Sequence, residues 1–131
     1  TNQSGIARKY YKLADLNQMH QKMNNLLENL GAKFEYIAFC QHHPDENCNC
    51  RKPNPGMLEQ IYEHTKIKPE SSIMIGDRMK DLQAGLTMGA DTALVLTGQG
   101  QQAIIENPQL KTNGTKIYPD LAACLEDLFQ I

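Results

Sequence analysis

The sequence lacks any apolar run near the roughly 20 residues that a membrane-spanning helix needs. It also lacks a basic stripe, because its 13 lysines and arginines are scattered among 15 acidic residues, for a net charge of −2. A nucleic-acid-binding face needs clustered cations, so we expect neither a membrane nor nucleic acid as a partner. The first residues do not resemble a signal peptide, and we expect a cytoplasmic protein.

Cysteine is scarce for a disulfide-stabilised fold, since four cysteines in 131 residues are too few for such a scaffold. No repeat and no Pro/Gly/Ser linker divides the chain. The content of 40% hydrophobic and 21% charged residues is typical of a globular protein of one domain. We therefore expect a single domain over residues 1–131, and we expect it to be monomeric.

Short apolar segments alternate with helical patterns along the chain. Apolar residues at helical spacing predict helices over 13–30, from Pro55 onward, over 81–90 and over 120–131, the last capped by Asp120. Apolar runs predict strands over 34–40, 71–77, 91–98 and 116–119, and residues 99–114 are expected to form a loop with one helical turn. Because the strands are apolar on both faces, we predict an α/β fold, a three-layer Rossmann-like parallel sheet with helices on both faces.

Ligands of such sheets bind at the carboxyl ends of the strands. Thr1, Cys40 and Asp77 fall at these ends. Functional residues should therefore gather there.

A cluster of soft ligands follows the first predicted strand, in "CQHHPDENCNC". Cys40, His42, Cys48 and Cys50 supply three thiolates and one imidazole, which is a complete tetrahedral shell for Zn²⁺. A shell closed by protein leaves no position for water, so this zinc would be structural and would order the loop 40–52. His43 is the less favoured histidine, because it precedes a proline and would turn away.

Disulfide bonds and a redox pair are the alternative roles for this cluster. Cys48 and Cys50 are too close to pair comfortably with each other, so an even set of disulfides would have to recruit Cys124, which we expect to be a buried core thiol. A redox pair formed by Cys48 and Cys50 would leave Cys40 and His42 without a role. Complete ligand sets at short spacing are specific signals, so we favour zinc.

Carboxylates and cations suited to phosphate chemistry surround these motifs. Asp77 ends an apolar strand and Asp81 follows one helical turn later, an arrangement that suits Mg²⁺, although Asp77 could instead cap the next helix. Arg51 and Lys52 follow the zinc ligands directly and could hold a phosphate, with a solvated basic pair as the alternative. The segment "TNQS" adds hydroxyl and amide groups, unless it is a frayed terminus.

The order of these motifs resembles the haloacid-dehalogenase-like phosphatases. The resemblance rests on "TNQSGIAR", on the cluster running into "RKPNPGM" and on "IGDRMKD". Within that family the chain is similar to the branch acting on D-glycero-D-manno-heptose 1,7-bisphosphate, with histidinol-phosphate phosphatases as close kin. "RKPNPGM" is closer to the heptose branch, whereas the five-residue spacer in the cluster and Arg78 are closer to the histidinol branch.

The resemblance implies a Mg²⁺-dependent phosphatase that removes the 7-phosphate of the heptose bisphosphate through an aspartyl-phosphate, in lipopolysaccharide precursor synthesis. It makes Lys52 and Thr1 the catalytic phosphate-binding residues, with Asp77 as Mg²⁺ ligand and Asp81 in or near the second shell. It also implies contacts with the small-molecule sugar phosphate from Thr1, Asn2, Gln3, Ser4, Arg51, Lys52 and Arg78.

The sequence departs from the family at two places. The family's first strand ends in Asp-x-Asp, the nucleophile and the acid/base, and no Asp-x-Asp occurs here. We therefore expect the C-terminal portion of a longer enzyme, inactive by itself without the N-terminal strand and nucleophile. Lys9 stands where the resemblance places a glycine. The alternatives are a histidinol-phosphate phosphatase and a non-catalytic, zinc-stabilised binding domain.

Overall fold

The sheet of this protein is formed by three parallel strands in the order β1-β2-β3. In a computed structural model that describes residues 1–130, they are β1 (Ile73–Gly76), β2 (Asp91–Val95) and β3 (Lys116–Tyr118). Ile75 pairs with Ala93, and Leu94 pairs with Ile117. The short β3 lies at an edge of the sheet, and the predicted fold class is confirmed.

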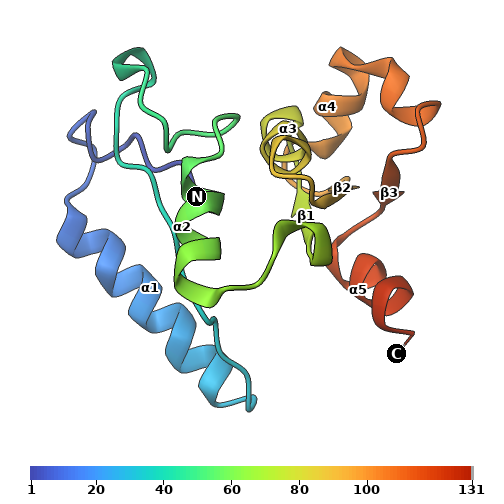
Figure 1. Ribbon diagram of the computed structural model, residues 1–131. Helices are drawn as coiled ribbons and strands as arrows, with labels where there is room; N and C mark the ends of the chain where they lie inside the picture. The colour runs from blue at the N-terminus through green and yellow to red at the C-terminus, as the bar shows by residue number, and fades with distance from the viewer. Residues whose placement is uncertain (131) are drawn as a thin grey trace.

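Helices cover both faces of this sheet (Figure 1). They are α3 (Met79–Thr87), α4 (Gly100–Glu106) and α5 (Leu121–Phe129). One face is packed by a core of Leu82, Leu94, Ala103, Ile104 and Leu110 from α3, β2, α4 and the following 3-10 helix Pro108–Lys111. The other face packs against α5 through Ala93, Val95 and the fully buried Cys124. The prediction that Cys124 is a core thiol is confirmed.

The amino-terminal part carries two more helices, α1 (Leu13–Glu28) and α2 (Gly56–Thr65), which lie to one side of the sheet in Figure 1, α1 farther from it than α2. Between them the chain passes through the cysteine cluster and the 3-10 helix Pro44–Glu46; the 3-10 helix Pro69–Ser71 then leads into β1. A separate small core of Ala38, Cys40 and Met57 lies under the cluster. No helix in residues 1–130 is long and apolar enough to cross a membrane.

The structure corrects two of the sequence-based predictions. Residues 34–40 form no strand apart from an isolated bridge between Asn2 and Cys40, because within residues 1–130 the segment has only Thr1–Gln3 as a hydrogen-bonding neighbour. Residues 99–114 are not mainly loop, because they contain α4 and a 3-10 helix. Asp120 caps α5 as predicted, accepting a hydrogen bond from the Ala123 N–H at 2.8 Å. Ile131, which the sequence places in this helix, lies outside the described residues.

Lys9 has a backbone φ of 60°. This is the left-handed conformation, which a glycine adopts at lower cost than any other residue. The expectation of a glycine at this position therefore has a physical basis in the turn that leads to α1.

Candidate active site

The four cluster residues bring their ligand atoms within 4.8 Å of one another. The Cys40 and Cys48 sulfurs lie 3.5 Å apart, as do those of Cys48 and Cys50, and His42 Nδ1 lies 3.6 Å from Cys40 Sγ. Two sulfurs of a tetrahedral zinc site would be about 3.8 Å apart for a Zn–S bond of about 2.3 Å. The cluster therefore has nearly the dimensions of a filled tetrahedral site.

The acid–base properties of the thiols also suit a cation. Burial raises the pKa of the Cys48 thiol, but hydrogen bonds from the Cys40 and Cys50 thiols lower it by more. The resulting pKa of Cys48 is about 7. Burial, and then the neighbouring Cys40 and Cys48, raise the pKa of Cys50 to about 12. The Cys48 thiol thus loses its proton readily whereas the Cys50 thiol resists doing so, and a bound cation would offset the repulsion between two neighbouring thiolates.

His43 lies beside these ligands but faces elsewhere. Its ring Nδ1 lies 3.2 Å from an Asp45 carboxylate oxygen and accepts a hydrogen bond from the Asp45 N–H. His43 also precedes Pro44, which begins the 3-10 helix. The structure therefore places His42 in the cluster and leaves His43 outside it.

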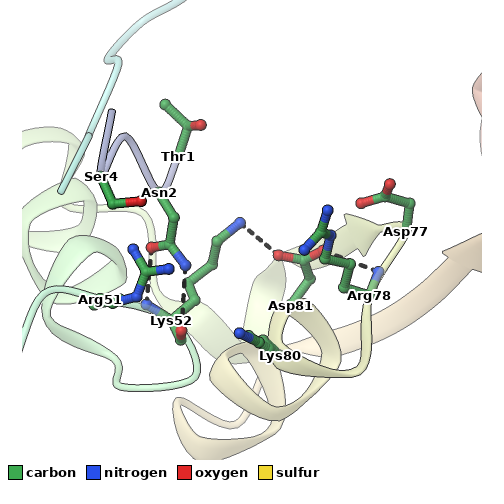
Figure 2. A pocket seen from close by; sticks show the side chains of 9 residues that line it. All are labelled: Thr1, Asn2, Ser4, Arg51, Lys52, Asp77, Arg78, Lys80 and Asp81. Atoms are coloured by element: carbon green, nitrogen blue, oxygen red, sulfur yellow. Dashed lines mark hydrogen bonds and ion pairs between the residues drawn. The ribbon is translucent and has the colours of Figure 1, made fainter. Parts of the chain in front are cut away.

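A polar cavity of about 370 Å³ opens next to the cluster, between the amino-terminal part and the start of α3 (Figure 2). Most of the residues predicted to handle phosphate line it together. The lining residues are Thr1, Asn2, Ser4, Arg51, Lys52, Asp77, Arg78, Lys80 and Asp81.

At the centre of this cavity an ion pair joins the two parts of the chain. Lys52 Nζ lies 2.5 Å from Asp81 Oδ1, and both side chains are largely buried. The second Asp81 oxygen accepts a hydrogen bond from the Arg78 N–H at 3.1 Å, so Asp81 also caps the first turn of α3. The Lys52 ammonium is thereby held by the first turn of α3, in the cavity that Asp77 also lines.

Asp77 is held from the opposite side, by the loop that follows β2. Its Oδ2 accepts the Gln99 N–H at 2.8 Å, rather than a hydrogen bond from α3. Gly98 allows this approach, because a Cβ at position 98 would collide with the Asp77 carboxylate, and its φ of 60° favours glycine. Asp77 also lines the cavity, and its other carboxylate oxygen could serve as a ligand for a hard cation.

Three further cations surround the cavity. Arg51 carries a buried Nη1 atom that has no hydrogen-bond partner within residues 1–130. Arg78 and Lys80 approach from the start of α3 (Figure 2). Lys80 is not among the residues predicted from the sequence, although the sequence contains a signal for it. A lysine in the first turn of a helix opposes the helix dipole, which indicates a role other than helix stability.

Not every residue of the amino-terminal segment 1–4 lines the cavity as predicted. Thr1 and Ser4 line the cavity, but Gln3 does not. Instead, Gln3 Nε2 donates a hydrogen bond to Thr1 Oγ1 at 3.1 Å, and Gln3 Oε1 accepts one from the Tyr11 hydroxyl. Asn2 lies at the cavity, but its amide is engaged by the backbone of Lys52.

Comparison with known proteins places this site in context. The sequence model of the HAD-hydrolase-like family matches residues 49–124. A D-glycero-beta-D-manno-heptose-1,7-bisphosphate 7-phosphatase of Pseudomonas putida is 46% identical over 128 residues, covering 98% of this chain and 71% of the relative. The enzyme of that name from Neisseria meningitidis is 40% identical, covering 92% of this chain and 65% of the relative.

Solved structures of D,D-heptose 1,7-bisphosphate phosphatases also resemble this chain. A D,D-heptose 1,7-bisphosphate phosphatase of Bordetella bronchiseptica, complexed with magnesium and phosphate, matches with a TM-score of 0.91 at 38% identity, over 99% of this chain and 72% of that structure. The corresponding enzyme of Burkholderia thailandensis matches with a TM-score of 0.73 at 31% identity, over 100% of this chain and 73% of that structure. The chain therefore spans about two thirds to three quarters of the length of these relatives.

Proposed function

Because this chain belongs to the family of HAD-like hydrolases, we propose that its protein is a Mg²⁺-dependent phosphatase of D-glycero-D-manno-heptose 1,7-bisphosphate, acting at the 7-position. The observation that carries the proposal is the convergence of Lys52, Asp77 and Asp81 in one polar cavity. The names of the relatives support the substrate. The chain itself would be one portion of the catalytic domain, with its loop 40–52 ordered by zinc.

The proposed reaction gives several side chains of the cavity a role in binding the phosphoryl group or the metal. The Lys52 ammonium offsets negative charge on the phosphoryl group, and the hydroxyls of Thr1 and Ser4 donate hydrogen bonds to its oxygens. Asp77 would hold Mg²⁺, with Asp81 in the second shell. When bound, the metal stabilises the charge that develops on the phosphoryl oxygens. Transfer through an aspartyl-phosphate, as the family resemblance implies, needs a carboxylate nucleophile besides these residues.

The surplus of cations favours the heptose bisphosphate over histidinol phosphate. Lys52 is paired with Asp81, which leaves Arg51, Arg78 and Lys80 around the cavity. A second phosphate would be attracted by these three groups, whereas the ammonium of histidinol phosphate would be repelled. We therefore place histidinol phosphate second, although Arg78 is a feature shared with that branch.

The test of the proposal is phosphate release by the full-length protein from the two substrates, with Mg²⁺ and with the metal chelated. We expect turnover of the heptose bisphosphate that requires Mg²⁺ and at least about a hundredfold lower kcat/KM for histidinol phosphate, a difference of about 2.7 kcal/mol. The reverse preference would establish the histidinol activity. No hydrolysis of either substrate would favour the non-catalytic binding domain.

Replacing Lys80 by methionine tests the contribution of this cation to substrate binding. Lys80 is exposed, so we expect only about a fivefold increase in KM for the bisphosphate, near the upper limit for exposed charge pairs. Turnover should be nearly unchanged. Lys111→Met, a matched change in the 3-10 helix that follows α4, should alter neither constant. A fall in kcat as large as the expected rise in KM would contradict the prediction that Lys80 acts only in substrate binding.

For the cluster we propose one structural Zn²⁺ bound by Cys40, His42, Cys48 and Cys50. Two observations support this zinc site. The distances between the ligand atoms are close to those of a tetrahedral site, and a bound cation would offset the repulsion between neighbouring thiolates. The position of Arg51 and Lys52 directly after Cys50 suggests that the metal orders both. A monomeric state and a cytoplasmic location stay predictions from the sequence.

Replacing Cys50 by serine tests this zinc site. We expect zinc affinity to fall by more than about a hundredfold, since even outer-shell changes cost about 10–100-fold. The melting temperature and turnover should fall with it. Cys124→Ser is the control: it should lower the melting temperature, because Cys124 is fully buried, but retain one equivalent of zinc by elemental analysis. Unchanged zinc content and melting temperature in Cys50→Ser would exclude the proposed ligand set.

A further inference from the structure

We propose that Asn2 is a positioning residue that fixes the backbone of Lys52 and so places the Lys52 ammonium in the cavity; its catalytic consequence rests on the proposed function. The family resemblance implies a contact between Asn2 and the substrate. The structure shows the Asn2 amide turned onto the main chain of Lys52, fifty residues away (Figure 2).

The contact between Asn2 and Lys52 uses both ends of the amide. The Lys52 N–H donates to Asn2 Oδ1 at 3.1 Å, and Asn2 Nδ2 donates to the Lys52 carbonyl at 3.2 Å. A single side chain thereby satisfies both backbone polar groups of one residue, as a neighbouring strand would do. Both bonds are partly buried, so water competes less with them than at the surface.

The backbone that carries Asn2 is itself fixed. The Cys40 N–H donates to the Thr1 carbonyl at 2.9 Å, and the Gln3 N–H donates to the Cys40 carbonyl at 2.7 Å. These two bonds bracket Asn2 and tie it to Cys40, a buried residue of the cluster. The amide thus connects the cluster to Lys52 by a second route, besides the chain that leads through Cys50 and Arg51.

Lys52 needs such a support because it lies in no helix or strand. Its long side chain must nevertheless reach Asp81 on a different element. Among side chains of this length, only asparagine offers both a neutral donor and an acceptor. Aspartate would keep the acceptor but place a carboxylate next to the Lys52 carbonyl, and alanine would remove both bonds.

The experiment compares Asn2→Ala and Asn2→Asp with Asn25→Ala in the full-length protein, Asn25 being an exposed residue of α1. For both Asn2 variants we expect kcat/KM for the heptose bisphosphate to fall on the order of a hundredfold, since a displacement of about 1 Å at a catalytic group has an effect of that size. The loss should fall mainly on kcat, because the other cations still bind the substrate. Asn25→Ala should behave like the unchanged protein.

A second measurement is independent of turnover. The Lys52 amide should exchange its hydrogen at least about tenfold faster in Asn2→Ala, with zinc content and melting temperature retained. If the unchanged protein hydrolyses no bisphosphate, the proposed function fails, but exchange at Lys52 still tests the contact. Unaltered exchange and kcat in Asn2→Ala would overturn the inference, as would loss of activity only together with zinc or the folded state.

Discussion

Replacing Asp77 by asparagine is expected to lower the Mg²⁺-dependent turnover of the full-length protein on the order of a thousandfold and to leave the fold intact. The amide oxygen of asparagine can still accept the Gln99 N–H, which closes the loop after β2 over this side chain. What is lost is the negative charge that a hard cation needs. A metal that stabilises phosphoryl charge contributes several kcal/mol to the barrier, and each 1.36 kcal/mol is about tenfold in rate.

The matched control for this prediction is Asp91→Asn. Asp91 is exposed at the start of β2, at the opposite end of the sheet from the cavity, so its neutralisation should leave turnover and the apparent Mg²⁺ affinity unchanged. Magnesium titrations of the rate and circular dichroism would be measured for both variants. Retained activity in Asp77→Asn would remove Asp77 from the metal site, and a lost circular-dichroism signature would assign it a structural role instead.

The parts of the fold that the sequence predicts well are those fixed by local patterns. β1 and β2 are short, largely apolar runs that end at a glycine or before a turn, and such runs are typical of parallel strands covered on both faces. Segment 34–40 has an equally apolar pattern but no neighbouring strand within residues 1–130 beyond the bridge at Cys40. Pairing is a non-local property, and the pattern of one segment cannot supply it.

The sequence predicts only one helical turn where α4 forms, for a related reason. Its sequence "GQQAIIE" has no strong cap, and its seven residues are too few to be stable as an isolated helix. It forms because Ala103 and Ile104 pack on Leu82 and Leu94, a core that only the assembled sheet creates. Tertiary packing, rather than helix propensity, decides such short elements.

In the candidate site, too, the sequence predicts contacts within one short motif but not contacts between distant segments. The cysteine cluster lies within eleven residues, so its spacing alone predicts its composition, and Pro44 after His43 indicates which histidine joins it. The pairing of Lys52 with Asp81 and the contact of Asn2 with Lys52 join segments far apart in the chain. No spacing rule within one motif could indicate either contact.

The last prediction concerns the ion pair at the centre of the cavity. Lys52→Met should lower turnover by at least about a thousandfold, because it removes the ammonium that we propose offsets charge on the phosphoryl group. It should also destabilise the protein by about 3 kcal/mol, because Asp81, which is 6% exposed, is left as a buried charge without its partner. Methionine retains most of the volume of the lysine side chain, so packing changes little.

A second substitution separates these two effects. In Lys52→Met/Asp81→Asn the uncompensated charge is gone, and the amide oxygen can still accept the Arg78 N–H that caps α3. Denaturant unfolding should therefore show most of the lost stability restored, since a buried ion pair can be replaced by neutral groups at little cost. Turnover should not recover, because the missing group is the cation rather than the pair. Activity restored together with stability would show that Lys52 serves only to neutralise Asp81 and would remove it from the proposed chemistry.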